Sequence, residues 1–505
     1  MINCEVKIRI PFLWGKAVFK KENWSQINLI VGPNGSGKTL LTQAITKEFA
    51  QKGYSLSPVQ KDADNFLILK NNDTIREKIE TVLSSMFGKS IKFIEDIDET
   101  FIPIVENKAW NVEYMLEDAE CHGLREIISL LIQLYSNSSN ILVFDEPELH
   151  LHPQLQMFFI NEIKKEARKN PKHIFFIVSH SPFFIDLRYA EDLMGVIVCH
   201  TNKVPTHIDN LSNEDSLLFK RFLPRFNTYH KQFFFSDNQI FVEGYTDQQM
   251  FTNLLPFIHD EYSSTGTGII DVGGKDELGV FCKVCSLLGT NGRIITDLDS
   301  LFSGKLRDVF CRDERVNSWL EKLYEKQLPF YERIFTQKEL LHPITLDKLI
   351  FRLERYLVAI GQDILQHTDE PPKKLATYIS KLNSLMEKHE NAENVDTYKT
   401  VILQGIIKQE ADLVKYLSPE LANTVADIKN LYSFILAAAE ACRVYILPKG
   451  CIEHYYTQNT IEYMPVSAKD RLFHNEIEYL LDSNKKTIQK EYSELIKILE
   501  KACSL

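Results

Sequence analysis

Acidic residues follow two apolar segments in the second half of the chain, and their spacing could hold a metal ion. The apolar segments are residues 240–242 and 294–296, and the acidic residues are Glu243, Asp247, Asp297 and Asp299. Carboxylates this close would repel one another, and a divalent cation between them removes the repulsion. Mg²⁺ prefers hard oxygen ligands of this kind. The pattern therefore predicts a Mg²⁺ site, with Mn²⁺ as the alternative ion; ordinary loop acids at strand ends are the competing interpretation.

A glycine-rich sequence near the N-terminus could bind the phosphates of a nucleotide. Residues 32–39 read Gly-Pro-Asn-Gly-Ser-Gly-Lys-Thr and follow the apolar segment 27–31, which predicts a strand, a loop and then a helix. Glycines let successive backbone N–H groups turn toward a phosphate, and the helix N-terminus presents its positive end. In this pattern the lysine contacts the β- and γ-phosphates and the threonine binds Mg²⁺. The predicted ATP-binding residues are Asn34, Gly35, Ser36, Gly37, Lys38 and Thr39, and Thr39 is also a predicted metal ligand.

Two further strand ends carry groups that can hydrolyse a nucleotide. Residues 141–144 are apolar and lead to Asp145 and Glu146. Asp145 can hold Mg²⁺, directly or through water, and Glu146 can polarise the attacking water. The apolar segment 174–178 is followed closely by His180, which we expect to sense the γ-phosphate. Taken alone, such a histidine is more often an ordinary loop residue.

The elements that must position these residues alternate between strand and helix. The predicted strands are 27–31, 141–144, 174–178, 239–242, 268–272, 293–296 and 443–447, and the predicted helices are 124–136, 154–169, 246–255 and 276–288. This alternation is typical of α/β domains with parallel sheets. Residues 301–440 differ, because long amphipathic helical patterns dominate there. We expect four parts: an ATPase domain at 1–230, the start of a second α/β domain at 236–300, a mostly helical insertion at 301–440, and at 441–505 the return of the second domain with C-terminal helices.

Length and charge limit the classes of protein that fit. With 505 residues the chain is too long for one core, and its formal charge is −11 at pH 7. That charge argues against a surface coated with basic residues for indiscriminate nucleic-acid binding, although a local basic groove stays compatible with it. Lysines and arginines interrupt the early apolar residues, and apolar stretches fall short of the roughly 18 residues of a membrane span. We expect a cytoplasmic protein without a membrane partner.

Residues 28–39, 141–153 and 174–182 resemble the ATPase heads of the ABC class, which includes SMC-like and OLD-family (overcoming lysogenisation defect) proteins. In that class two heads meet face to face, and a signature loop completes the site of the partner. The resemblance therefore implies a homodimer or higher oligomer. The candidate loop, residues 121–126, departs from the Ser-Gly-Gly pattern because no serine precedes Gly123. Gln60 is a candidate Mg²⁺-sensing residue, although a plain surface glutamine is the favoured interpretation.

Residues 236–300 and 443–460 resemble a Toprim domain, the fold shared by topoisomerases, primases and OLD nucleases. The resemblance implies two metal ions, one held by Glu243 with Asp297 and Asp299, and one by Asp247 with Glu453, which lies in the sequence Leu-Pro-Lys-Gly-Cys-Ile-Glu at 447–453. It also implies a lysine that stabilises the cleaved phosphate: Lys469, with Lys449 as the alternative. For Glu453 the competing interpretation is an acid at a helix N-terminus.

The fold class expected from both resemblances is α/β: an ABC-type P-loop ATPase domain followed by a Toprim domain that carries a mostly helical insertion. The expected function is an ATP-regulated, divalent-metal-dependent endonuclease, as in Gabija-type or retron-associated antiphage effectors. DNA is the expected substrate and RNA the alternative. An operon partner, a helicase or a retron reverse transcriptase with its RNA and DNA, is also implied.

Two other functions compete. One is a regulatory ATPase scaffold that holds a partner protein or RNA, and the other is an SMC-like repair ATPase, for which the gap from 40 to 120 is too short to hold a long coiled coil.

Lys348, Arg352 and Arg355 of the insertion could clamp nucleic acid, but a solvated helix face is the favoured interpretation for each of them.

Overall fold

The computed structural model describes residues 2–56, 68–69, 71–95, 101–116, 122–136, 139–236, 238–258, 267–366, 370–386 and 392–504. Gln60 and Cys121, the first residue of the candidate signature loop, lie outside these ranges. The chain divides into two compact units, Met1–Asp237 with Leu287–Gly289, and Asn238–Ser286 with Thr290–Leu505. Among the described residues, no helix combines the length and apolar character that crossing a membrane requires.

A five-stranded sheet forms the core of the first unit, with the strand order β10-β9-β3-β8-β7. All its neighbouring strands are parallel except the edge pair β9 and β10. Strand β8 is buried along its whole length, which explains its unbroken apolar sequence. Because β8 lies between β3 and β7, the ends of all three strands meet at one edge of the sheet.

The first unit contains two smaller antiparallel sheets besides its central one. These are β1-β2 and β4-β5-β6. Its strands are β1 (Ile2–Ile8), β2 (Phe19–Trp24), β3 (Ile27–Val31), β4 (Ser90–Glu95), β5 (Phe101–Asn107), β6 (Val112–Met115), β7 (Ile141–Asp145), β8 (Ile174–Val178), β9 (Val196–Val198) and β10 (Thr206–His207). Its α-helices are α1 (Pro11–Trp14), α2 (Lys38–Gln51), α4 (Asp73–Phe87), α6 (His122–Tyr135), α7 (Pro153–Lys169) and α8 (Asn213–Phe222).

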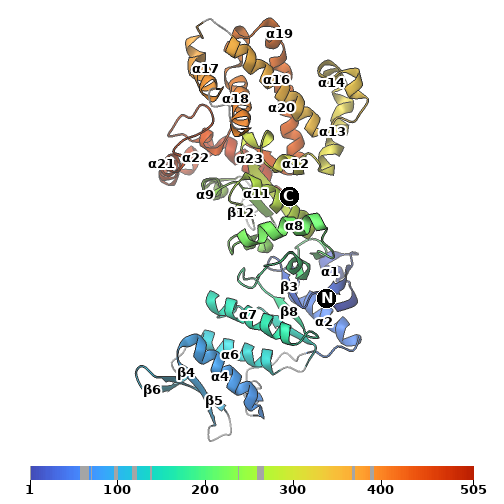
Figure 1. Ribbon diagram of the computed structural model, residues 1–505, viewed down its shortest axis with the longest axis vertical. Helices are drawn as coiled ribbons and strands as arrows, with labels where there is room; N and C mark the ends of the chain where they lie inside the picture. Colours follow the sequence, from blue (N-terminus) through green and yellow to red (C-terminus); the bar gives the residue numbers. More distant parts are fainter. Residues whose placement is uncertain are drawn as a thin grey trace. The chain divides into compact units, whose positions relative to one another are not determined.

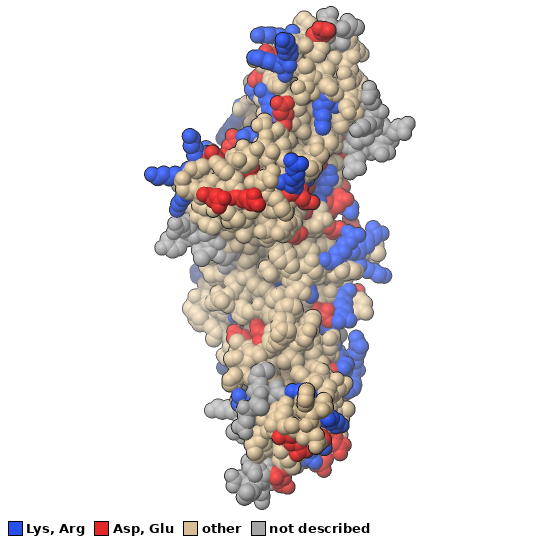
Figure 2. All heavy atoms as spheres, turned by 90° about the vertical axis from the view of Figure 1, so that its left-hand side faces the viewer, with Lys and Arg blue, Asp and Glu red and all other residues tan. Residues whose placement is uncertain are grey.

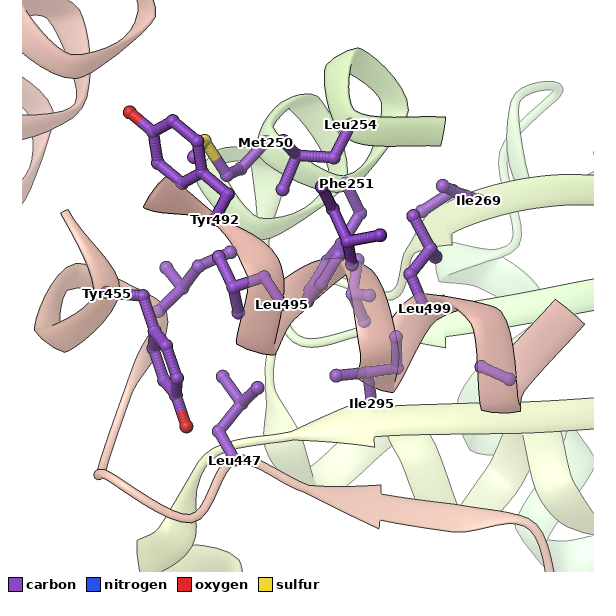
Figure 3. Packing of buried hydrophobic residues seen from close by; sticks show 14 of the residues in the cluster. Met250, Phe251, Leu254, Ile269, Ile295, Leu447, Tyr455, Tyr492, Leu495 and Leu499 are labelled. Atoms are coloured by element: carbon purple, nitrogen blue, oxygen red, sulfur yellow. The ribbon is translucent and has the colours of Figure 1, made fainter. Parts of the chain in front are cut away.

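A four-stranded parallel sheet forms the core of the second unit, with the order β12-β11-β13-β14. Alternate residues of β11 point to opposite faces. Ile240 packs with α9 and the C-terminal helix α23 on one face, and Phe241 contacts Phe281 of α11 on the other, with ring centroids 4.9 Å apart. Figure 3 shows Leu495 and Leu499 of α23 over the strands, beside Phe251 of α9.

Between β13 and β14 the second unit contains a bundle of helices, in which α16, α17, α18 and α20 pack on one another (Figure 1). The strands of this unit are β11 (Asn238–Val242), β12 (Thr267–Asp271), β13 (Asn291–Thr296) and β14 (Val444–Ile446). Its helices are α9 (Tyr245–Leu254), α11 (Lys275–Leu288), α12 (Leu306–Phe310), α13 (Glu314–Lys326), α14 (Leu328–Ile334), α15 (Gln337–Leu340), α16 (Leu346–Gln366), α17 (Lys373–Met386), α18 (Ala392–Tyr416), α19 (Pro419–Ala422), α20 (Thr424–Ala441), α21 (Lys469–Asp482), α22 (Lys485–Glu491) and α23 (Ser493–Cys503).

Basic and acidic side chains are interspersed on the surface shown in Figure 2, and neither sign covers either unit there. Two of the three cations suggested for a nucleic-acid clamp make contacts within the helical bundle. Arg352 pairs with Glu339 at 2.6 Å, and Lys348 donates to the Pro343 carbonyl at 2.8 Å. These contacts agree with the favoured interpretation of an ordinary helix surface.

Candidate functional site

The phosphate-binding loop joins β3 to α2, as the sequence predicts. Gly35 and Gly37 have φ values of 77° and 83°, which a residue with a side chain rarely adopts. The Lys38 ammonium lies inside the loop and donates to the carbonyls of Gly32 at 3.1 Å and Pro33 at 2.8 Å. Burial lowers the pKa of Lys38. Within the described part of the chain, the hydrogen-bond partners of this buried cation are carbonyls, which fits an incoming phosphate.

Asp145 ends β7 beside the first residues of α2. Its Oδ1 atom accepts a hydrogen bond from the Thr39 hydroxyl at 3.4 Å. Burial raises the pKa of Asp145, and the Thr39 hydrogen bond opposes that shift. A hydroxyl and a carboxylate oxygen this close are the two protein ligands expected for a nucleotide-bound Mg²⁺.

Glu146 and His180 lie next to each other at the ends of β7 and β8. The His180 Nε2 atom is 3.7 Å from Glu146 Oε1. Glu146 has a φ of 51°, a left-handed conformation that is strained for a residue with a side chain. Burial, followed by Lys38, lowers the pKa of His180, which favours the neutral ring at physiological pH. The carboxylate of Glu146 and the neutral imidazole of His180 thus lie at the same edge of the sheet as the phosphate loop.

Glu148 has a positioning role that we did not assign from the sequence. It accepts hydrogen bonds from the Ser179 hydroxyl at 2.9 Å and from the His180 backbone N–H at 2.5 Å. These bonds fix the end of β8 against the loop after β7. The position of Glu148, two residues after Glu146, was the available signal.

Three carboxylates converge at the ends of β11 and β13, which are neighbouring parallel strands. Glu243, Asp297 and Asp299 each offer an oxygen, and these oxygens lie within 4.8 Å of one another. Strand β13 ends at Thr296, and Asp299 lies in a 3-10 helix, η5 (Leu298–Leu301), so a tight turn brings it beside Asp297.

Among the described residues, one oxygen of Glu243 and one of Asp299 receive no hydrogen bond. Glu243 accepts all three of its hydrogen bonds on Oε1, from the Thr296 hydroxyl at 2.6 Å, the Asp297 N–H at 3.0 Å and the Ser300 hydroxyl at 3.2 Å. The Oδ1 atom of Asp299 is buried without a hydrogen-bond partner. An unpartnered buried carboxylate oxygen is costly unless a cation binds it. The donor set therefore fits a divalent cation.

Asp247 and Glu453 add two more carboxylates to this centre. Asp247, in the first turn of α9, accepts the Gly244 N–H at 3.2 Å. Glu453, in the 3-10 helix η6 (Ile452–Tyr455), is 1% exposed. Neither of its buried oxygens accepts a hydrogen bond of good geometry, although the Lys469 ammonium is 3.1 Å from Oε1.

The acids of this centre affect one another's protonation. Burial, with Glu243 and Glu453, raises the pKa of Asp247 to about 7. Burial and the carboxylates of Glu243, Asp247 and Asp299 raise the pKa of Asp297 well above its usual range. Two of the five acids predicted from the sequence thus have pKa values that their acidic neighbours help to raise. Which of them bind metal stays a prediction.

A cavity of about 360 Å³ is lined by Glu243, Asp297 and Asp299. Lys469 lines it, whereas Lys449, the alternative lysine, pairs with Glu494 at 2.6 Å. A second cation, Lys275, was missed: its Nζ is 3.1 Å from Asp299 Oδ2 and 2.6 Å from the Ser303 hydroxyl. It follows β12, whose end meets the same sheet edge, so strand topology could have indicated it.

The helical bundle also reaches this cavity. Asp396 and Thr397 of α18 line it together with the acids of the sheet. Nothing in the sequence indicated this contact, because it depends on how a distant helix packs.

Comparison with known families supports both halves of this description. Residues 234–299 match the family model described as overcoming lysogenization defect protein-like, TOPRIM domain. Residues 112–185 match an AAA ATPase domain, and residues 28–109 match the ATPase family associated with various cellular activities. The two ATPase matches contain the phosphate loop and the strand ends that carry Asp145 and His180.

Two curated relatives have a nuclease name. An OLD nuclease from Thermus scotoductus is 25% identical over 195 residues, covering 37% of this chain and 34% of the relative. Endonuclease GajA from Bacillus cereus is 25% identical over 330 residues, covering 56% of this chain and 47% of the relative. The chain thus spans less than half the length of these relatives.

Among solved structures, the SMC head domain from Thermotoga maritima matches 42% of this chain and all of that chain, at a TM-score of 0.30 and 11% identity. A score this low adds no weight, and the ATPase assignment depends on the loop, the strand order and the family models. The predicted fold class is confirmed, with an α/β ATPase domain followed by a Toprim domain and many helices. The comparisons also confirm the predicted resemblance: the chain is similar to OLD-family proteins and matches both an ATPase domain and a Toprim domain.

Proposed function

We propose that this chain is an ATP-regulated endonuclease that hydrolyses phosphodiester bonds of DNA with the help of divalent metal ions. The observation that carries the proposal is the group of Glu243, Asp297 and Asp299, which line a cavity and whose oxygens lie within 4.8 Å of one another. A nuclease name in both relatives supports the same activity. The resemblance also implies a role in prokaryotic antiphage defence.

We assign the first metal position to Glu243, Asp297 and Asp299, and the second to Asp247 and Glu453. Mg²⁺ is the proposed ion, with Mn²⁺ as a substitute. Bound there, such an ion supplies a Lewis acid for the phosphate and lowers the pKa of a bound water. Lys469 pairs with Glu453 and faces the cavity, where its ammonium can hold the phosphate of the cut strand.

In the ATPase unit, Lys38 binds the phosphates, Thr39 and Asp145 hold the nucleotide's Mg²⁺, and Glu146 orients water. Exposed apolar side chains follow this machinery directly in sequence: Leu40 is 43% exposed and Leu149 is 54% exposed. Apolar groups beside a nucleotide site favour a second copy of the chain as the covering surface. We therefore propose a homodimer through the ATPase units, with any operon-encoded helicase or reverse transcriptase as a further partner.

A cleavage assay tests the proposed activity. Purified protein is incubated with plasmid DNA or with RNA, in Mg²⁺, Mn²⁺ or EDTA, with and without ATP. We expect metal-dependent nicking or cutting of DNA that changes with ATP and disappears in Glu243→Gln. Intact DNA under every condition, with metal binding preserved, would favour the regulatory scaffold instead.

A further inference from the structure

Gln404 of α18 makes a set of buried contacts far from the predicted ligands in sequence. Its side chain is 1% exposed. The amide Nε2 donates to the Lys449 carbonyl at 2.7 Å and lies 3.0 Å from His454 Nε2. Its Oε1 accepts the Met464 N–H at 3.0 Å. One glutamine thus bridges two separate segments of the chain.

The hydrogen bonds to backbone groups fix the orientation of the Gln404 side-chain amide. Because Oε1 is the atom that accepts the Met464 N–H, the amide NH₂ faces Lys449 and His454. The other ring nitrogen of His454, Nδ1, accepts the Cys451 backbone N–H at 3.1 Å and lies 3.0 Å from Cys451 Sγ. Gln404 and Cys451 thus contact opposite edges of the same imidazole ring and fix its position.

The two segments that Gln404 bridges lead to Glu453 and Lys469, which form an ion pair. Lys449 and His454 belong to the turn that carries Glu453. Met464 belongs to the segment that leads to Lys469 and lines the cavity. The turn fits tightly against the glutamine: Gly450 has a φ of 139°, and a Cβ atom there would lie 2.4 Å from Gln404 Nε2. The Gly450 carbonyl accepts the Leu298 N–H at 2.8 Å, which joins this turn to the Asp297–Asp299 segment.

We propose that Gln404 is a positioning residue of the metal centre, through which the helical bundle sets the place of Glu453 and Lys469. The proposal rests on the two-metal function proposed above and adds a specific dependence to it. The metal position assigned to Asp247 and Glu453 requires Gln404. The position assigned to Glu243, Asp297 and Asp299 does not, because the oxygens of Glu243 are held by β13 and η5.

Metal titration of the full-length protein tests this dependence. Mn²⁺ is titrated without nucleotide by calorimetry and by electron paramagnetic resonance, for the wild type and for Gln404→Met, which keeps the side-chain length and removes every donor. Removing an outer hydrogen bond to a ligand typically weakens metal binding about 10- to 100-fold. We expect one Mn²⁺ to bind as in the wild type and the second to bind about 10- to 100-fold more weakly.

A second variant and a control make the result specific. Gln404→Glu keeps an acceptor for the Met464 N–H but cannot donate to Lys449 or His454, so we expect the same selective loss. Gln362→Glu adds the same charge at an exposed position of α16 and should bind both ions normally.

The possible outcomes are distinguishable. Unchanged binding in both Gln404 variants contradicts the inference. Loss of both ions together also contradicts it, since the first position would then depend on Gln404 as well. A wild type that binds no Mn²⁺ contradicts the proposed function itself.

Discussion

Replacing Glu243 separates its structural role from its role as a ligand. Its Oε1 atom accepts three hydrogen bonds, from the Thr296 hydroxyl, the Asp297 N–H and the Ser300 hydroxyl. In Glu243→Gln the amide oxygen can accept all three, while the NH₂ group replaces the free Oε2. We therefore expect a folded protein that has lost a metal ligand, with a Kd for Mn²⁺ raised at least about tenfold, or about 1.4 kcal/mol.

Glu243→Ala should behave differently because it removes the acceptor. The Thr296 and Ser300 hydroxyls are 2.6 Å apart and can bond to each other. The Asp297 N–H is then left without its partner. A buried donor left unsatisfied costs about 1–3 kcal/mol. We expect the alanine variant to be less stable than the glutamine variant by that amount.

Denaturant unfolding in EDTA and Mn²⁺ calorimetry measure both effects, with nucleotide binding as the control for the ATPase unit. Both variants should bind ATP as the wild type does. Equal stability of the alanine and glutamine variants would refute the role given to Oε1. Wild-type cleavage by the glutamine variant would refute the assignment of Glu243 to the metal.

Three more predictions concern the ATPase residue Glu146, the cation Lys275 and proton competition. Glu146→Gln should bind ATP normally but hydrolyse it at least about a hundredfold more slowly, because the carboxylate that orients water is lost; unchanged phosphate release would exclude that role. Lys275→Met should bind Mn²⁺ more tightly and cleave DNA more slowly, because the ammonium that neutralises Asp299 is removed; weaker Mn²⁺ binding would contradict this. The pKa of Asp247, raised to about 7 by burial and by Glu243 and Glu453, predicts that Mn²⁺ affinity falls as the pH is lowered through 7, because the proton must leave first. Without metal, the folded protein holds this proton at pH values above the pKa of Asp247 in the unfolded chain, which is about 4. The contribution of Asp247 to the stability of the folded protein should therefore decline from pH 4 to 7. Titrations and melting curves that do not vary with pH would contradict both statements.

Strand ends could be located from the sequence because apolar runs stop where the chain turns. The predicted strand at 174–178 coincides with β8, and the one at 239–242 differs from β11 by one residue. Topology then brings Glu243 and Asp297 together, since parallel neighbours share an edge. The position of Asp299 depended on a 3-10 turn that periodicity does not reveal.

Contacts that depend on distant packing could not be predicted. Gln404 is one polar residue in a long amphipathic helix, and only the fold shows that it faces the Glu453 turn. Asp396 reaches the cavity from the same helix. Lys275 is an intermediate case, because its place after a predicted strand was visible and its partner Asp299 was already a candidate ligand.

The most direct test of the central claim is a crystal structure of the full chain soaked in Mn²⁺, with anomalous data collected at the manganese edge. We predict a manganese peak within bonding distance of Glu243, Asp297 and Asp299, and a second one near Asp247 and Glu453. No manganese at the first three carboxylates, with Lys275 still paired to Asp299 in ordered density, would contradict the account.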